Sequence, residues 1–140
     1  RRHVSLGTRY SEDVNFIVAL LRKYQPEITI IHTPGGEKLD HGESGYLMYL
    51  AFKKAMAQGI AVGQLWTAPH GWLSDAPSVE SGRGKADVHI DIRNNQAVKY
   101  QAWNKHRSQN GGDIEKSLGS RRPRYDQDVE KFITILDNTK

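Results

Sequence analysis

The sequence predicts an α+β domain in which a small antiparallel sheet packs against a central helix. The segment at 46–59 is apolar on almost every side through Phe52, which is typical of a helix buried in a domain core. Short apolar runs at 27–31 and 60–66 are typical of buried strands. From 85 to 96 polar and apolar residues alternate, which indicates a strand with one buried face.

A helix over 10–24 comes first. Ser11 can cap its start, and Glu12 and Asp13 suit the positive end of a helix dipole, while Pro26 stops it. Its apolar residues fall on one face: Val14, Ile17, Val18 and Leu21. The same spacing returns near the end of the chain, at Val129, Phe132, Ile133 and Leu136. We therefore expect a second, C-terminal helix at 125–137, and we interpret both as structural.

The remaining segments connect these elements. A Gly-rich loop with many ionisable groups is expected at 32–45, and a long Pro- and Gly-rich excursion at 67–84. The strand at 85–96 ends in an "RNNQ" turn, so 97–103 is its expected hairpin partner. A basic Gly- and Arg-rich loop is expected at about 104–124.

Length and composition are those of an ordinary folded domain. With 140 residues, the chain is expected to be a single domain over 1–140. The absence of cysteine excludes disulfides, Cys-ligated zinc, iron–sulfur clusters and thiol nucleophiles. Any metal would therefore be held by His and carboxylate side chains.

Hydropathy bears on location. No apolar run is long enough to cross a bilayer, and no charged-then-apolar leader starts this chain. We expect no membrane span, and an extracytoplasmic, secreted or phage-delivered protein, with a cytoplasmic one as the alternative. The sequence leaves the oligomeric state open.

Positive charge is concentrated in one region. The net charge is +4, and residues 93–124 hold eight Lys or Arg against two acids. Such a region favours a polyanion, either nucleic acid or an acidic cell wall.

Candidate metal ligands lie on both sides of the central helix. The first group is His32, Glu37, Asp40, His41 and Glu43, and the second is Asp87, His89 and Asp91. A zinc hydrolase needs three protein ligands, an open position for water and a further carboxylate as base. Asp87 shares a strand face with His89 and can be that base, with Glu80 as its competitor.

The order of these elements resembles the zinc peptidases of the D-alanyl-D-alanine carboxypeptidase and L-alanyl-D-glutamate endopeptidase group and the related hedgehog signalling domain. In that family a His and an Asp lie on a His-x-x-Gly-x-Ala-x-Asp segment, and a second His lies on a later strand. Here "HTPGGEKLD" supplies His32, Gly35 and Asp40, and "KADVHIDIRNN" supplies His89. The resemblance covers residues 28 to 103.

The resemblance implies a hedgehog-like fold and one Zn²⁺ held by His32, Asp40 and His89. It also implies hydrolysis of peptidoglycan stem peptides, as in a cell-wall-degrading carboxypeptidase or endolysin-like enzyme. His32 and Asp40 are one residue further apart than in the family, so His41 is the alternate ligand. The family's catalytic carboxylate lies three or more residues before the last His, so Asp87 and Glu80 both stay candidates.

Three residues are candidates for substrate binding: Trp66, His70 and Arg93. A second segment, "ITIIHTPGG", resembles the oxyanion-forming segment of Clp-type and serine-dehydrogenase-type proteases, in which backbone N–H groups stabilise an oxyanion. No Ser placed near a second His on a following helix accompanies it, and the chain is short for that fold, so this resemblance is set aside.

Two other functions stay open. One is a nucleic-acid-binding or toxin-type nuclease domain, which would bind phosphates through 93–124 and cleave with His89 and either His41 or Lys99. The other is a non-catalytic binding domain on the same fold.

Overall fold

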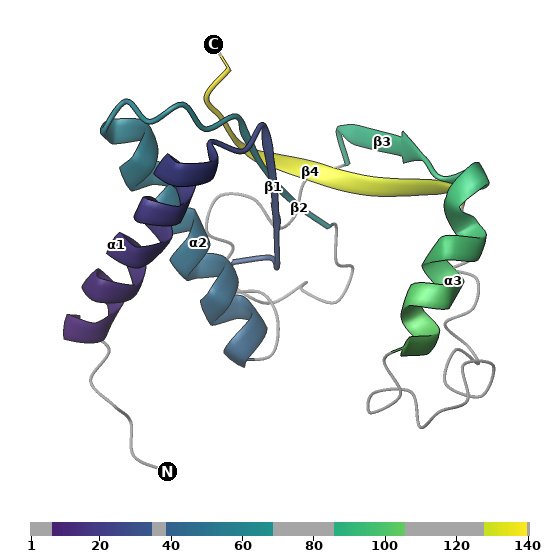
Figure 1. The fold of residues 1–140 in the computed structure, drawn as a ribbon, viewed down its shortest axis with the longest axis horizontal. Coiled ribbons are helices and arrows are strands. Elements are labelled where there is room, and N and C mark those ends of the chain that lie inside the picture. Colours follow the sequence, from purple (N-terminus) through teal and green to yellow (C-terminus); the bar gives the residue numbers. More distant parts are fainter. Residues whose placement is uncertain (1–6, 35–38, 69–85, 106–127, 140) are drawn as a thin grey trace. The chain divides into compact units, whose positions relative to one another are not determined.

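The computed structural model describes residues 7–34, 39–68, 86–105 and 128–139 (Figure 1). Its elements follow in the order α1 (Gly7–Tyr24), β1 (Ile28–Ile31), α2 (Leu39–Ala57), β2 (Gln64–Thr67), β3 (Val88–Asp91), the 3₁₀ turn η1 (Arg93–Asn95), α3 (Gln96–Lys105) and β4 (Val129–Asp137). The chain divides into two compact units, Arg1–Val88 with Phe132–Lys140, and His89–Lys131. None of the helices described is long and apolar enough to span a bilayer.

The four strands form a mixed sheet in the order β1-β2-β4-β3. β1 pairs parallel to β2, from Ile28 opposite Gln64 to Ile31 opposite Thr67. β2 pairs antiparallel to β4, with an irregularity between Leu65 and Trp66. The α+β class is therefore confirmed. The purely antiparallel sheet is wrong, because α2 lies between β1 and β2 in the chain and a helical crossover joins parallel neighbours.

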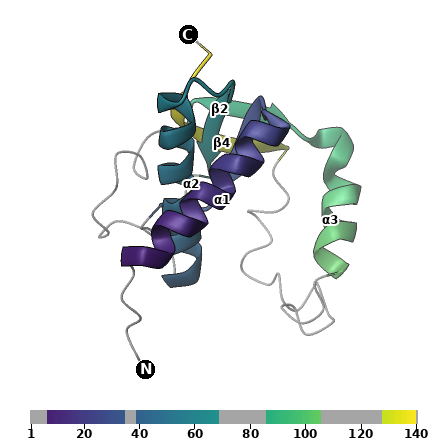
Figure 2. The ribbon, with the colours of Figure 1, turned by 60° about the vertical axis from the view of Figure 1, so that its left-hand side comes forward.

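The core of the first unit lies where α1 and α2 pack side by side (Figure 1, Figure 2). α1 contributes Val14, Val18 and Leu21, and ends before Pro26 as predicted. α2 contributes Ala51, Phe52 and Ala55, all fully buried. The remaining buried members of the cluster are Tyr49, Ile60, Val62 and Leu65. The prediction of a central buried helix is confirmed.

α2 begins at Leu39, seven residues before the start expected at 46. The expected loop at 32–45 is wrong over 39–45, which is helical. Gly45 explains the difference, because a Cβ there would lie 2.3 Å from the carbonyl oxygen of His32. This glycine lets a helix approach a strand end and does not mark a loop.

Two more glycines shape the path from α2 to β2. Gly59 has a φ of +66°, the left-handed conformation in which helices commonly end. Gly63 lies against the backbone of Glu27, and its N–H donates to the carbonyl of Pro26 over 2.9 Å. A Cβ at Gly63 would lie 2.0 Å from the Glu27 carbonyl oxygen. This close contact starts the β1–β2 pair.

The second unit holds α3, where the sequence predicted a hairpin partner. The expected strand at 97–103 is wrong, because these residues lie in the helix Gln96–Lys105. The partner of β3 is the distant β4. Within this unit the Ile92 N–H donates to the Asp128 carbonyl over 2.7 Å.

The predicted C-terminal helix at 125–137 is also wrong, because Val129–Asp137 is a nine-residue strand. Its apolar residues suit a helical repeat, but the segment is rich in β-branched side chains, which favour a strand. β4 is at least partly buried on both faces, apart from Lys131. The edge of β2 that does not pair with β1 pairs with β4, and this tertiary pairing overrides the helical pattern of the local sequence.

Exchanging each of two glycines for alanine tests the close contact at the start of β1 and β2. Gly63→Ala should lower the free energy of unfolding by about 2–3 kcal/mol, because backbone must move. In Gly59→Ala the new Cβ would have no neighbouring atom within 4 Å, and only the positive φ is unfavourable. We therefore expect the free energy of unfolding to fall by about 1 kcal/mol. Urea unfolding followed by circular dichroism measures both. Equal losses would contradict the contact at Gly63.

Candidate functional site

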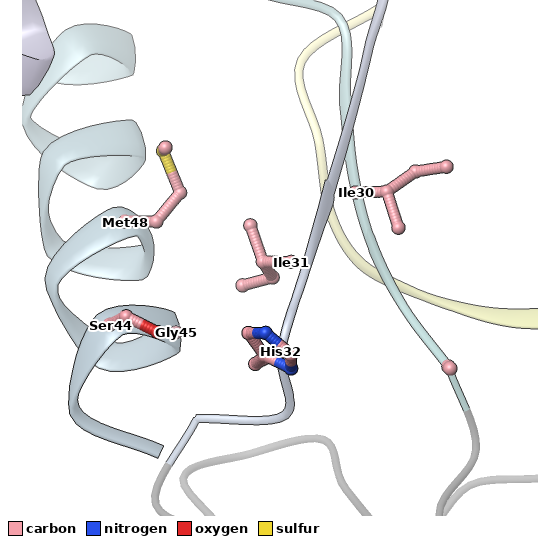
Figure 3. A pocket seen from close by; sticks show the side chains of 7 residues that line it. Ile30, Ile31, His32, Ser44, Gly45 and Met48 are labelled. Atoms are coloured by element: carbon pink, nitrogen blue, oxygen red, sulfur yellow. The ribbon is translucent and has the colours of Figure 1, made fainter. Parts of the chain in front are cut away.

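A pocket of about 520 Å³ opens in the first unit where β1 ends and α2 begins (Figure 3). It is lined by Ile30, Ile31, His32, Ser44, Gly45, Met48 and Ala68. These residues come from the carboxyl ends of the parallel strands β1 and β2 and from the first turns of α2. Sheets with parallel strands commonly bind ligands at this end, and the volume suits a small molecule or a peptide end.

Two histidines lie together at this pocket. His32 directly follows β1, and His41 is on the first turn of α2. Their rings are stacked, with centroids 4.3 Å apart and planes inclined by 14°. Both side chains are exposed, and His32 is part of the pocket wall. The structure thus brings together the two His residues that the sequence offered as alternate zinc ligands.

Apolar side chains make up the deeper part of the pocket. Ile31 and Met48 point toward each other between the strand and the helix (Figure 3). Ile30 points to the other side of β1. Ser44 lies on α2 beside Gly45, and its hydroxyl donates to the carbonyl of His41 over 2.8 Å. The pocket therefore combines an apolar interior with a polar rim.

A buried pair of threonines holds the strand ends together behind the site. The hydroxyl oxygens of Thr33 and Thr67 lie 3.0 Å apart. The Thr67 hydroxyl lies 3.2 Å from the Ile31 carbonyl oxygen and the Thr33 hydroxyl 3.3 Å from the Ala68 carbonyl oxygen, so the two hydroxyl hydrogens are shared among these three contacts. Sequence reasoning missed both residues. The signal was a threonine within two residues of the end of an apolar run, because a buried hydroxyl needs backbone partners.

The surroundings of Tyr10 on α1 raise its pKa. Burial raises the pKa of Tyr10, and the charge of Glu43 and the neighbouring Tyr46 raise it further. Tyr10 is on α1, and the other two are on α2 near its start. The Tyr10 hydroxyl therefore stays protonated and can donate a hydrogen bond at neutral pH.

The remaining predicted ligands do not join the histidine pair as a complete set. Asp40 is exposed on the first turn of α2, where its carboxylate accepts the His41 N–H over 3.0 Å. His89 is exposed on β3 and belongs to the second unit. Within the described ranges, no group of three or more His, Cys, Asp or Glu side chains is placed to hold a metal ion. The zinc ligand set His32, Asp40 and His89 stays a prediction.

The predicted base Asp87 directly precedes β3, and this strand is less buried than expected. Val88 is half-buried, while Ile90 is 39% exposed, so the apolar face of β3 is not a deep core. The Asp87 carboxylate accepts a hydrogen bond from the backbone N–H of Thr134 over 2.9 Å. The backbone N–H of Asp87 donates to the Phe132 carbonyl over 3.1 Å. Asp87 thus ties its strand to β4. The competing base Glu80 lies outside the described residues, as does His70.

The other predicted binding residues also have structural contacts. Trp66 is buried, stacks at a tilt against Phe132 with centroids 5.7 Å apart, and donates to Gln64 over 2.9 Å. In the second unit Arg93 pairs with Asp91, and Lys99 pairs with Glu130. Two cations of the basic region 93–124 are thus matched by carboxylates, which reduces what they offer to a polyanion.

Family models, curated proteins and solved structures were compared with the chain, and none of them matches.

The ion pair between Arg93 and Asp91 can be measured through the pKa of Asp91. The Arg93 side chain, then its backbone N–H, lower the pKa of Asp91 from 3.8 to about 2. Arg93→Gln should raise this pKa toward 3.8, but not fully, because the backbone hydrogen bond remains. Arg93→Lys should fall between, because it keeps the charge and loses the planar fork. Carboxyl chemical shifts followed by NMR measure each value.

The sign of the linked stability effect follows from the lowered pKa. The folded state gains from the pair at pH values above 3.8, and the gain is lost as the pH falls toward 2. Both side chains are exposed, so water screens the effect. An unchanged Asp91 pKa in Arg93→Gln would contradict the pairing.

Proposed function

We propose that this chain hydrolyses peptide bonds at the pocket between β1 and α2, with peptidoglycan stem peptides as the substrate class. The observation that carries the proposal is that His32 lines that pocket and that His41 stacks on His32. Imidazole is the side chain best suited to accept and donate protons near neutral pH, and it is also a frequent zinc ligand. Two imidazoles at one pocket supply either chemistry.

The chain's own residues have separate roles in this proposal. In the absence of metal, one imidazole in its neutral form takes a proton from the attacking water and then gives it to the leaving amine as the C–N bond breaks. An N–H of the other donates to the carbonyl oxygen as it gains negative charge. The positive end of the α2 dipole favours a substrate carboxylate at the same place. Ile31 and Met48 suit a small aliphatic side chain such as that of alanine.

Zinc is the proposed cofactor. His32 and His41 offer two nitrogen donors from adjacent elements, and Asp40 offers a carboxylate one residue away from His41. These donor types fit Zn²⁺, and His89 is the further ligand that the family resemblance implies. When bound to both imidazoles, Zn²⁺ would take over their roles, because it would lower the pKa of its water to about 7 and polarise the substrate carbonyl, and a carboxylate would then accept the water's proton.

A metal-independent peptide hydrolase is the second candidate. The parallel β1–α2–β2 arrangement favours it, because "ITIIHTPGG" covers β1 and leads toward the start of α2. The segment resembles one that stabilises an oxyanion through backbone N–H groups. The two candidates share the pocket and His32, and they differ in their need for metal.

Metal content and peptidoglycan digestion, measured on the same variants, test the proposal. We expect about one Zn²⁺ per chain and release of stem-peptide fragments, both lost on chelation. His32→Ala and His41→Ala should each lower the digestion rate by about a hundredfold or more. His89→Ala separates the ligand sets, because it loses zinc only if His89 is a ligand. Gln101→Ala, exposed on α3, is the unaffected control.

Three results would decide against parts of the proposal. Full digestion by both His32→Ala and His41→Ala would overturn the placement of the site. Digestion that persists without metal would reject zinc and favour the second candidate. No digestion of peptidoglycan by wild-type protein loaded with zinc would reject the substrate class.

A further inference from the structure

Helix α1 exposes a line of large apolar side chains on the side away from the core. Phe16 and Tyr24 are each 67% exposed, and Leu20 is 39% exposed. They are spaced by four residues, so they form one stripe along the helix, hereafter the α1 stripe. The inner face of α1 is already covered, because it buries Val14, Val18 and Leu21 against α2. Exposed aromatic side chains in a row are typical of a protein interface.

Opposite charges flank the two ends of the α1 stripe. Asp13 precedes Phe16 by three residues, and Lys23 follows Leu20 by three, so both lie beside the stripe on the helix surface. Glu12 adds a second acid at the first end. The Lys23 ammonium lies 5.1 Å from the centroid of the Tyr24 ring, which keeps it along the stripe. The stripe therefore runs from an acidic end to a basic end.

We propose that the α1 stripe binds the α1 stripe of a second copy of this chain, antiparallel and about a twofold axis. In this arrangement Phe16 packs on Leu20 of the second copy. Asp13 then lies opposite Lys23 of the second copy, and the same pair forms twice. A twofold interface requires a self-complementary surface, and a stripe with one acidic and one basic end meets that requirement.

The size of the stripe sets the strength expected. Three apolar side chains from each copy form a smaller contact than stable dimers use. We therefore expect a weak dimer with a dissociation constant on the order of 10 to 100 μM. This inference is independent of the proposed function, because none of the stripe residues lines the pocket.

Sedimentation equilibrium from low to high micromolar concentration tests the dimer, with charge exchanges to test its orientation. Leu20→Glu should leave a monomer. Asp13→Lys and Lys23→Asp should each weaken association roughly tenfold, because two attractive pairs become repulsive. The double exchange Asp13→Lys with Lys23→Asp should restore it, since the opposite charges meet again. Lys131→Asp, which makes the same charge change as Lys23→Asp at the exposed position of β4, should have no effect.

Circular dichroism of each variant checks that α1 still folds, so a loss of association is not a loss of structure. A wild-type chain that stays monomeric to several hundred micromolar would overturn the proposal. A dimer that survives Leu20→Glu would place the interface elsewhere and also overturn it. Failure of the double exchange to restore association would reject the antiparallel second copy and leave the stripe to a different protein.

Discussion

The packing of α2 against the end of β1 is the constraint on which the rest of the first unit depends. Gly45 lets the first turns of the helix approach the His32 carbonyl at a distance that a side chain would forbid. That approach sets His41 on α2 over His32, and it brings α2 close enough to bury Phe52 against α1 and the sheet. Because α2 then returns the chain to β2, the two strands are parallel and their carboxyl ends meet at one edge.

The chemistry of the pocket follows from this edge. The hydroxyls of Thr33 and Thr67 join the ends of β1 and β2, so the backbone that carries His32 is held on both sides. The interior between Ile31 and Met48 is apolar, while His32 and Ser44 are at the rim. His32 and His41 are exposed beside this apolar wall, so water and a substrate can reach both imidazoles. The proposed hydrolysis uses these groups, with zinc as the proposed partner of the imidazoles.

The second unit is governed by charge pairing. Arg93 lies against Asp91, and Lys99 against Glu130 on β4. Gln96 at the start of α3 donates to the Asp128 carboxylate over 2.8 Å, so side chains of this helix contact both Asp128 and Glu130 beside it in the same unit. The alternation of polar residues along β3 therefore serves strand pairing and ion pairing, in addition to whatever role His89 has. The cations that the sequence assigned to a polyanion are in these cases used within the fold.

The local sequence pattern was sufficient to predict a helix or strand that buries one of its faces. It predicted α1 with its end before Pro26, the strand β1, the core of α2 and the strand β3, because periodicity and stop signals are properties of adjacent residues. It also offered His32 and His41 as alternate ligands. The start of α2, the helix α3 and the strand β4 depended on residues far along the chain. The sequence around Gly45 predicted a loop, and its close contact with the His32 carbonyl explains the helix found there. The segment 129–137 predicted a helix, and its pairing with the edge of β2 explains the strand. The sequence by itself determined the α+β class and the residues able to do chemistry. The tertiary structure decided which of them meet, because strand pairing and close backbone contacts join positions that no local window contains.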